Sequence, residues 1–425
     1  MTTSFIRDDD RQLCVGGLSL NDIAAKYGTP LYVYSGDGIR TDYRNFVAAV
    51  AAVDGQVHFA LKANSALGVM ALLASQGAGA DIVSGGELQR ALVAGVPAAK
   101  IVFSGVGKSD AEIGAALDAG VGQINAESAA EVAAISRIAA ARGAMAPVAL
   151  RVNVDVAPDT HAKISTGQRS TKFGVSISQN EAASLYRQLA ADPHIQPAGL
   201  AVHIGSQILD LDPFRRAYSA LLDFGTSLRG EGLPVPTLDL GGGIGVDYED
   251  GTATDFTSYG KLVSQIFADS GFRLGFEPGR SIVANNGVLL TSVIYTKDGD
   301  NKRFVIVDAA MNDLLRPTLY EAHHAVVPVD PPGVMHGPAD IVGPVCETGD
   351  YLAQDRMMPA LAAGDRLAVM SAGAYGAVMA SNYNTRPPAG EVMVLDGECH
   401  LLRRQRDIAE LLAEEIIPDQ VSSQT

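Results

Sequence analysis

The chain has 425 residues, of which 47% are hydrophobic and 19% charged, and its formal net charge is −16 at pH 7. This length is too great for one ordinary core and predicts about two or three domains, or a large barrel with a second domain. The negative charge argues against nucleic acid or an anionic membrane as a partner, and no apolar segment approaches the length of a membrane span.

Cysteine usage and the N-terminus predict a cytoplasmic protein. The three cysteines, Cys14, Cys346 and Cys399, are odd in number and far apart. This fits a reducing compartment and no disulfide framework. The first twelve residues contain no apolar run, so no secretory signal is expected.

The N-terminal segment, residues 1–28, combines a short strand with a short helix. The apolar run Leu13–Val15 predicts the strand, and Ser19–Tyr27 has the pattern of a helix capped by its serine. A second strand is expected over Leu31–Tyr34, followed by a helix over residues 37–52.

Residues 29–282 alternate strand-like runs with alanine- and leucine-rich stretches of helical spacing. Such alternation specifies parallel strands joined by right-handed crossovers. Eight strands in this length predict an α/β fold, the (β/α)8 TIM-like barrel, with an open doubly wound sheet as the alternative. The expected strands are Val57–Leu61, Ala80–Val83, Ile101–Phe103, Gly122–Asn125, Val148–Val152, Leu200–His203, Thr237–Leu240 and Arg273–Phe276.

A barrel of this type places its active site at the C-terminal ends of its strands. A polar residue or glycine at any one of these ends is explained by the turn that ends the strand. In a barrel, however, all eight are expected to lie on the same rim. They are polar residues or glycine: Lys62, Ser84, Ser104, Asn125, Asn153, His203, Gly241 and Glu277.

Lys62 is the organising group of this rim. An ammonium beside the apolar run Val57–Leu61 must find an anion, lower its pKa or form a covalent bond. A Schiff base resolves the conflict, because the lysine then reacts as a neutral amine. The alternative is a lysine that extends from the strand end into solvent.

The loops after the seventh and eighth strands predict a site for an anionic cofactor. The run 241–243 is triglycine and can form an anion nest, and barrels often bind phosphate in this position. Glu277 can hold a protonated ring nitrogen, and Arg280 can bind a carboxylate. An ion pair between Glu277 and Arg280 that fixes the turn is the alternative.

Two histidines lie near the expected rim. His203 can stack on a planar cofactor, bind a metal or act as a base. No cluster with metal-ligand spacing accompanies it, so no metal is expected. The second, His161, lies with Lys163 in the irregular stretch 155–176, which we interpret as a flap beside the site.

Beyond residue 283 the pattern changes to β-type runs with turn signals and little helix. This predicts an antiparallel β domain over 283–425, which the N-terminal segment can join, so that the barrel is an insertion. The expected strands are Val288–Tyr295, Arg303–Val307, Ala325–Val329, Asp340–Val342, Arg366–Val369 and Glu391–Leu395.

Three motifs of this domain carry reactive side chains. Cys346 and Glu347 share a glycine-bounded loop, where the thiol can donate a proton or be a small buried hydrophobe. Arg316 and Tyr320 are four residues apart and share one face if they are helical. Tyr375 lies between small residues and can reach a ligand phosphate.

Together these motifs resemble the diaminopimelate decarboxylases, a branch of the pyridoxal-phosphate enzymes with the alanine-racemase-like fold. The resemblance covers residues 28–387. It rests on Ala60-Leu-Lys-Ala-Asn64, Gly79-Ala-Asp-Ile-Val-Ser84, Val102-Phe-Ser-Gly-Val-Gly-Lys108, His161-Ala-Lys-Ile-Ser-Thr166, His203-Ile-Gly-Ser-Gln207, Gly241-Gly-Gly243, Glu277-Pro-Gly-Arg280, Arg316-Pro-Thr-Leu-Tyr320 and Cys346-Glu-Thr-Gly-Asp350.

The resemblance implies a pyridoxal 5'-phosphate cofactor. Lys62 would carry it as a Schiff base, His203 would stack on its ring, and Glu277 would pair with the ring nitrogen. The other cofactor-binding residues would be Ser206, Gly241, Gly242, Gly243, Pro278, Gly279, Arg280 and Tyr375.

The resemblance also implies how an amino-acid substrate is bound. Arg280, Arg316 and Tyr320 would bind substrate carboxylates, with Tyr375 as a further contact. Glu347 would pair with the distal ammonium, and Cys346 would be the catalytic proton donor beside Lys62 and His203. The family builds each site at a dimer interface, so Cys346 and Glu347 would come from the second subunit of a homodimer.

The implied reaction is decarboxylation of meso-2,6-diaminopimelate to L-lysine and carbon dioxide, the last step of lysine biosynthesis. The alternatives are a related decarboxylase of D-ornithine, D-lysine or carboxynorspermidine, a non-catalytic cofactor-binding homologue, and an aldolase-like barrel that uses Lys62 without a cofactor. Glu347 argues against the first of these, and Lys62 together with Cys346 argues against the second.

Overall fold

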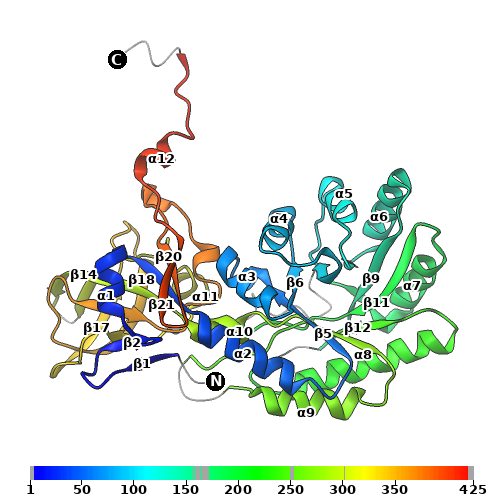
Figure 1. Cartoon of the computed structure of the whole chain (residues 1–425), viewed down its shortest axis with the longest axis horizontal. Helices are drawn as coiled ribbons and strands as arrows, with labels where there is room; N and C mark the ends of the chain where they lie inside the picture. Colours follow the sequence, from blue (N-terminus) through cyan, green and yellow to red (C-terminus); the bar gives the residue numbers. More distant parts are fainter. Residues whose placement is uncertain are drawn as a thin grey trace. The chain divides into compact units, whose positions relative to one another are not determined.

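The computed structural model describes residues 4–156, 158, 164, 172–248, 253–300 and 302–419. Its contacts divide the chain into two units, which Figure 1 shows in sequence colours. The first, here called the barrel unit, is Gly38–Val283, and the second, the sheet unit, combines Thr2–Asp37 with Ala284–Thr425. The division falls after Asp37, whereas the sequence pattern placed the start of the barrel domain at residue 29.

In the barrel unit, eight parallel strands close on themselves. Each strand pairs with the next in the order below, and the last pairs back to the first, which excludes an open sheet and confirms the predicted TIM-like fold. The strands are β5 (Gly55–Ala60), β6 (Gly79–Ile82), β7 (Ile101–Phe103), β8 (Gln123–Ala126), β9 (Ala146–Asn153), β11 (Ile195–Ala201), β12 (Thr237–Asp239) and β13 (Arg273–Phe276). A short strand, β10 (Val175–Ser176), adds to β9.

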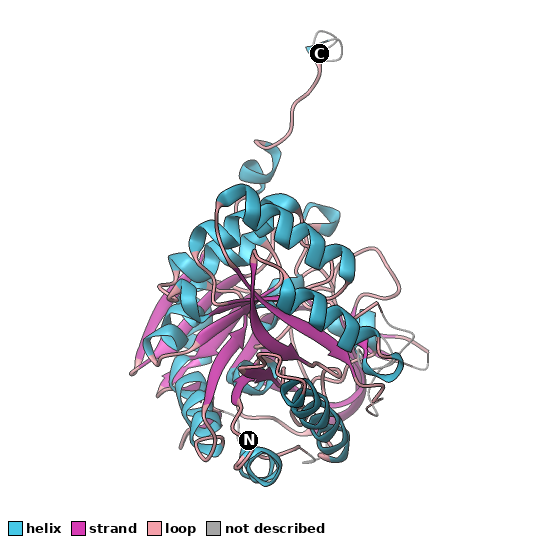
Figure 2. Cartoon of the chain, turned by 90° about the vertical axis from the view of Figure 1, so that its right-hand side faces the viewer, coloured by secondary structure: helices cyan, strands magenta, loops and turns pink. Residues whose placement is uncertain are grey.

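Helices surround these strands, as the end view of the barrel in Figure 2 shows. Several begin where the sequence supplies a cap: the hydroxyls of Ser84, Ser109 and Ser128 each accept the amide hydrogen three residues further on. The helices are α2 (Gly36–Ala49), α3 (Leu67–Ser75), α4 (Gly85–Val93), α5 (Asp110–Ala119), α6 (Ala129–Arg142), α7 (Glu181–Ala191), α8 (Asp212–Gly230), α9 (Phe256–Phe267) and the short α10 (Arg280–Val283).

The strand β11 begins earlier than the sequence pattern predicts. The expectation was Leu200–His203, but pairing with β9 already starts at Ile195, with an irregularity between Pro197 and Gly199. Proline and glycine both weaken the signal of a strand, and they are tolerated here because the irregularity interrupts the ladder.

A buried lysine ties the loop after β7 to its neighbours. The side chain of Lys108 is 1% exposed, and its Nζ donates to the carbonyls of Gly105 and Asn125 at 2.6 and 2.7 Å. It also donates to Glu131 Oε1 at 2.8 Å. All three donor positions of the ammonium are therefore used, so this cation can be buried.

Replacing Lys108 by methionine is expected to lower the free energy of unfolding by about 3 to 5 kcal/mol, because the buried Glu131 carboxylate loses its cation. Denaturant unfolding monitored by circular dichroism measures the effect. The double variant Lys108→Met with Glu131→Gln should recover part of the loss. Lys261→Met, at an exposed position of α9, serves as the control and should change stability little. A single variant as stable as the control would contradict this role.

The sheet unit is built around the long strand β14 (Gly287–Asp298). The N-terminal strand β4 (Leu31–Ser35) pairs with β14 and with β20 (Gly390–Leu395). The sheet therefore includes residues that the sequence pattern assigned to the barrel domain and not to the N-terminal segment 1–28. The remaining strands are β15 (Arg303–Val307), β16 (Val326–Pro328), β17 (Met335–Val342), β18 (Tyr351–Pro359), β19 (Arg366–Val369) and β21 (Glu398–Arg403).

The sheet is mixed, which refines the predicted antiparallel arrangement. Most of its pairs are antiparallel, but β15 pairs with β17 and β4 with β20 in parallel. Neither of these pairs is joined by a hairpin: β16 lies between β15 and β17 in the chain and pairs with β19, and β4 comes from the other end of the sequence. Parallel neighbours require such long connections.

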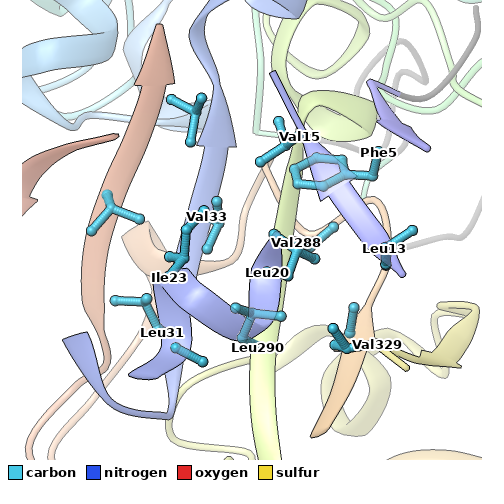
Figure 3. Packing of buried hydrophobic residues seen from close by; sticks show 14 residues of the cluster. Phe5, Leu13, Val15, Leu20, Ile23, Leu31, Val33, Val288, Leu290 and Val329 are labelled. Carbon is cyan, nitrogen blue, oxygen red and sulfur yellow. The ribbon is translucent and has the colours of Figure 1, made fainter. Parts of the chain in front are cut away.

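The N-terminal segment is held to the sheet unit by apolar packing. A small sheet of β1 (Phe5–Arg7), β2 (Leu13–Val15) and β3 (Leu18–Ser19) precedes α1 (Leu20–Tyr27), which Ser19 caps as predicted. Figure 3 shows Phe5 and Leu20 from this segment beside Val288, Leu290 and Val329. Burial of these side chains favours docking of the segment over its release.

No helix within the part of the chain that the structure describes is both long enough and apolar enough to cross a membrane.

Candidate active site

Lys62 lies just beyond β5, in a turn of 3-10 helix at Leu61–Ala63. Its Nζ donates to Asp81 Oδ2 at 2.6 Å, and the lysine side chain is 32% exposed whereas the aspartate is fully buried. Asp81 is on β6, where it faces Ala60 of β5 across the parallel ladder. The amine therefore lies at the C-terminal end of the barrel strands, held by an anion that keeps it oriented.

Asp81 is a site residue that the sequence interpretation missed. The motif Gly79–Ser84 was used only as evidence for the family resemblance. It nevertheless places an acid, Asp81, inside an otherwise apolar strand. Such an acid needs a cation or a hydrogen-bond donor nearby, and this was the available signal. Its second oxygen, Oδ1, is buried and has no hydrogen-bond partner among the described residues.

His203 follows β11 and is held as a neutral ring. Burial lowers the pKa of its imidazole well below the usual range, and the charges of Lys62 and Arg151 lower it further. Its Nδ1 accepts the amide hydrogen of Gly242 at 3.3 Å, so in the neutral ring the proton is on Nε2. The ring can therefore pack against an aromatic group without carrying a charge of its own.

The triglycine bend follows β12 and fits tightly against its neighbours. A Cβ on Gly241 would lie 2.5 Å from the Val202 carbonyl, and one on Gly242 would lie 2.2 Å from the Glu277 carbonyl. Gly243 has φ of 111°, a conformation that favours glycine. The amides of Gly241 and Gly242 donate to Asp239 and His203, so the bend also orients side chains of the site.

Glu277 comes directly after β13 and is almost completely buried. Burial raises the pKa of its carboxyl well above the usual range, and the negative charges of Asp239 and Asp81 raise it further. The positive charges of Lys62 and Arg151 act in the opposite direction. Its Oε1 is buried and has no hydrogen-bond partner in the described part of the chain, so it is available to accept a hydrogen bond from a ligand.

Arg280, in α10, is buried and bonded to neutral groups of the barrel unit. Its two terminal nitrogens donate to the hydroxyls of Tyr248 and Ser206, each at 2.9 Å. Among the described residues Glu277 forms no ion pair with Arg280, so the alternative interpretation of this turn is wrong. Arg280 instead brings Ser206 into the site.

A second buried cation, Arg151, contributes to lowering the pKa of His203. Arg151 on β9 donates to Glu127 at 3.0 Å and lies 4.7 Å from the centre of the Phe173 ring. Both members of the ion pair are buried. The sequence interpretation did not single out this pair, because the two residues lie on different strand ends and only the closed barrel brings them together.

Within the sheet unit, Arg316 begins the helix α11 (Arg316–Tyr320), so Arg316 and Tyr320 share a short helix. The guanidinium of Arg316 is buried and donates to His324 Nε2 at 2.8 Å. His324 Nδ1 in turn donates to the Met370 carbonyl at 2.8 Å, which fixes the ring as the neutral tautomer with an accepting Nε2. These contacts hold the arginine rigidly.

Cys346 and Glu347 occupy an exposed loop of the sheet unit. The buried Asp350 anchors this loop, because its two oxygens accept the amides of Met311 and Val345 at 2.7 Å each. Glu347 accepts a hydrogen bond from the Tyr383 hydroxyl and thereby raises the pKa of that phenol. Cys346 is exposed, so the interpretation of its thiol as a buried hydrophobe is wrong.

Tyr375 lies in the loop after β19 with φ of 55°, an uncommon conformation for a residue other than glycine. His161 and Lys163 of the predicted flap lie outside the described residues. In the barrel unit, contacts and charges connect Lys62, His203, the triglycine bend, Glu277 and Arg280 into one site. The structure thus combines an amine nucleophile, a carboxyl group that can accept a hydrogen bond and a neutral imidazole. These groups suit covalent catalysis through the amine, with the carboxyl group bound to a protonated ring.

The comparisons with known proteins agree with this site. A model of the pyridoxal-dependent decarboxylase family, pyridoxal binding domain, matches residues 37–284. A diaminopimelate decarboxylase of Pseudomonas aeruginosa is 49% identical over 410 residues, which cover 96% of this chain and 98% of that protein. One of Zymomonas mobilis is 48% identical over 408 residues, which cover 95% and 96%.

Solved structures give the same result. A diaminopimelate decarboxylase of Helicobacter pylori, complexed with L-lysine, superposes with a TM-score of 0.89 at 40% identity, covering 93% of this chain and 98% of that chain. A diaminopimelate decarboxylase of M. jannaschii, also with L-lysine, superposes with a TM-score of 0.94 at 33% identity, covering 98% and 99%.

Proposed function

This chain belongs to the pyridoxal-dependent diaminopimelate decarboxylase family, and from that membership we propose how its residues divide the reaction. It decarboxylates meso-2,6-diaminopimelate to L-lysine and carbon dioxide, the last step of lysine biosynthesis. The observation that carries the assignment of roles is that backbone hydrogen bonds join the segments of Lys62, Glu277 and His203. The Ala60 amide donates to the Pro278 carbonyl at 3.1 Å and the Glu277 amide to the Gly241 carbonyl at 2.8 Å, while the Gly242 amide donates to His203.

The residues present fit pyridoxal phosphate. A protonated pyridine nitrogen is a donor, and the buried Oε1 of Glu277 is an acceptor without a partner among the described residues. Pyridoxal phosphate, when bound, would supply a ring that accepts the electron pair left when carbon dioxide departs. Glu277 keeps the ring nitrogen protonated, because an anionic neighbour raises the pKa of a cationic acid.

We assign Lys62 as the residue that would hold the cofactor through its aldehyde. Asp81 would hold the Lys62 ammonium whenever it is free, since the two groups are 2.6 Å apart. His203 packs its neutral ring against the pyridine, and the Gly242 amide fixes the orientation of that ring. Ser206, Pro278, Gly279, Arg280 and the triglycine bend form the remaining cofactor contacts of the barrel unit.

Substituting Gly242 by alanine is expected to weaken binding of pyridoxal phosphate at least about tenfold, because a Cβ at 2.2 Å from the Glu277 carbonyl must displace the bend or Glu277 itself. Absorbance titration of the cofactor-free protein with pyridoxal phosphate measures the dissociation constant. The control is Gly230→Ala at the end of α8, where a Cβ would meet nothing within 4 Å. Equal affinity of the two variants would refute the proposed role.

We propose that residues of the sheet unit recognise the substrate and complete the chemistry. Arg316 and Tyr320, with Arg280 and Tyr375, bind the substrate carboxylates, and Glu347 pairs with the distal ammonium. Cys346 delivers the proton to the carbon that lost carbon dioxide, for which its exposure in a loop anchored by Asp350 is suitable. An analogue without the distal charges would leave these groups unpaired and bind less well.

We also propose a cytoplasmic homodimer with shared active sites, in which Cys346 and Glu347 come from the second subunit. The free thiols of Cys14, Cys346 and Cys399 support the location, since disulfides are rare there. We further propose that the barrel unit is the cofactor-binding domain and the sheet unit the domain of substrate recognition.

Mixing the inactive variants Lys62→Ala and Cys346→Ala is expected to restore activity if the sites are shared. Random reassociation makes about half of the dimers mixed, and each mixed dimer contains one site with both residues intact, so about a quarter of wild-type activity should return. The mixture is assayed for carbon dioxide after dissociation and refolding at equal amounts. No recovery, with dimers present by sedimentation, would show that each subunit forms its site alone.

Purified protein supplied with pyridoxal phosphate tests the function directly. It should release carbon dioxide from meso-diaminopimelate and form L-lysine, with far lower rates on D-ornithine, D-lysine and carboxynorspermidine. A preference for one of these three would move the chain to a sister activity. Cofactor binding without turnover of any substrate would make it a non-catalytic homologue.

A further inference from the structure

Cys346 is the middle residue of a tight turn, residues 345–347, here called the thiol turn. The Glu347 amide donates to the Val345 carbonyl at 2.8 Å, which closes this turn around Cys346. Asp350 holds its base, because Oδ2 of Asp350 accepts the Val345 amide at 2.7 Å and the Asp350 amide donates to the Glu347 carbonyl at 3.1 Å. These bonds fix the residues on both sides of Cys346.

The amide of Cys346 itself is bonded to a different part of the sheet unit. It donates to Oδ1 of Asn384 at 3.2 Å, across 38 positions of the chain. Because the Cys346 amide is a donor, the oxygen and not the nitrogen of the Asn384 side chain must face it. Asn384 therefore holds the tip of the thiol turn, while Asp350 holds its base.

The backbone around Asn384 has an uncommon conformation. Asn384 has φ of 55° and ψ of 28°, and Thr385 has φ of 56°, so two consecutive residues other than glycine are left-handed. Asparagine adopts this conformation more readily than most residues, whereas a β-branched threonine does so rarely. Such residues persist where the surrounding contacts hold them in place.

The contacts that hold Asn384 come from the chain between β15 and α11. They fix both ends of residues 381–386, here called the asparagine segment. The Ser381 amide donates to the Asn312 carbonyl at 2.9 Å, and Nη2 of Arg386 donates to the Asp308 carbonyl at 2.6 Å. The thiol turn is anchored to the same stretch, because the Met311 amide donates to Asp350 at 2.7 Å. The two segments thus share one support and meet again at Asn384.

We propose that Asn384 is a positioning residue for the proton donor, because its side-chain oxygen fixes the tip of the thiol turn and with it the direction of the thiol. The inference rests on the proposed function. In that function the S–H bond of Cys346 breaks, a C–H bond forms on the carbon that lost carbon dioxide, and the thiolate regains a proton from water. Such a transfer needs the thiol within reach of one atom, so a turn held at its tip favours it.

Three variants separate the hydrogen bond from the backbone conformation. Asn384→Gly removes the accepting oxygen, but glycine adopts a φ of 55° without cost, so the course of the chain is kept. Asn384→Asp retains an acceptor at the same place. Thr385→Gly is the matched control, since it relaxes the same segment at an exposed residue and leaves the bond to Cys346 intact.

Hydrogen exchange of the cofactor-free protein tests the contact itself, without any turnover. The Cys346 amide should exchange at least about threefold faster in Asn384→Gly than in the wild type, as expected from the loss of one hydrogen bond. Its rate in Asn384→Asp and in Thr385→Gly should stay close to that of the wild type. Mass spectrometry with fragmentation that resolves single amides measures these rates. Equal rates in Asn384→Gly and the wild type would overturn the inference.

Steady-state kinetics of the loaded enzyme test the consequence for the reaction. In Asn384→Gly we expect kcat to fall about tenfold with KM within about twofold of the wild type, because the bond acts on the proton donor and not on substrate binding. Asn384→Asp should recover most of kcat, and Thr385→Gly should leave both constants unchanged. An unchanged kcat in Asn384→Gly, or a loss that appears in KM instead, would defeat the proposal.

Failure of this inference is distinguishable from failure of the proposed function. A wild-type protein that neither binds pyridoxal phosphate nor releases carbon dioxide would refute the proposed function. An active wild type whose Cys346→Ala variant is inactive, but whose Asn384→Gly variant is as fast as the wild type, would refute only the role of Asn384.

Discussion

Lys62→Ala should lose decarboxylation almost completely, with a fall in kcat of about 10⁴-fold or more. The variant removes the amine that binds the cofactor, and among the residues that the structure describes no other amine pairs with Asp81. The assay is release of carbon dioxide from meso-diaminopimelate at saturating pyridoxal phosphate. Residual activity within about tenfold of wild type would mean that Lys62 is not the covalent residue.

Two further variants separate chemistry from electrostatics at this position. Lys62→Arg keeps a cation near the buried Asp81 carboxylate but cannot form the Schiff base, so it should be as inactive as alanine while unfolding at a temperature closer to wild type. Lys261→Ala removes an exposed lysine of α9 and should be fully active. Activity in Lys62→Arg would show that charge, and not covalent binding, is what position 62 contributes.

Glu277→Gln should lower kcat by about 10² to 10³-fold while leaving the protein folded. The amide is neutral, so it cannot hold the pyridine nitrogen in its protonated form, and the ring becomes a poorer acceptor of electrons. The absorbance of the bound cofactor and the rate of carbon dioxide release are both measured. Wild-type kcat in this variant would exclude the pairing of Glu277 with the nitrogen.

The stability of Glu277→Gln provides the internal control. Burial raises the pKa of the Glu277 carboxyl well above its usual range, which favours the neutral acid in the cofactor-free protein, and a neutral amide resembles that form. Thermal unfolding of the cofactor-free variant should therefore match the wild type. A large destabilisation would mean that Glu277 acts chiefly in the fold.

The barrel was predictable because each of its strands carries its own signal. Runs such as Ile101–Phe103 and Arg273–Phe276 are short, apolar and followed by turns, and their observed bounds equal the expected ones. Closure of the barrel also places the strand ends on one rim, so residues far apart in sequence could be grouped before any coordinates were known. Lys62, His203 and Glu277 were identified in this way.

Strands without such a signal were missed. β18, Tyr351–Pro359, carries Gln354, Asp355 and Arg356 in its middle, and β21, Glu398–Arg403, is largely exposed. Their pairing partners, β17 and β20, decide that these residues are strands. Cross-strand pairing depends on tertiary context, which a local pattern of hydrophobic residues does not contain.

The supporting residues of the site were also beyond local patterns. Asp81, Arg151 and Asp239 lie in strands that are otherwise largely apolar. A single charged residue in such a strand does not fit the hydrophobic pattern, and the sequence does not show which residue pairs with it. Asp81 pairs with Lys62 across neighbouring strands, and Arg151 pairs with Glu127 at the neighbouring strand end. The negative charge of Asp239 raises the pKa of Glu277, which follows the adjacent strand. Each pairing follows from the register of the closed barrel.

Reduction of the wild-type holoenzyme with borohydride, followed by digestion and mass analysis, tests the central claim most directly. The reagent converts a Schiff base into a stable amine, so the peptide that contains Lys62 should carry a phosphopyridoxyl group, and no other lysine peptide should. An unmodified Lys62 peptide, or the group on a different lysine, would contradict the account.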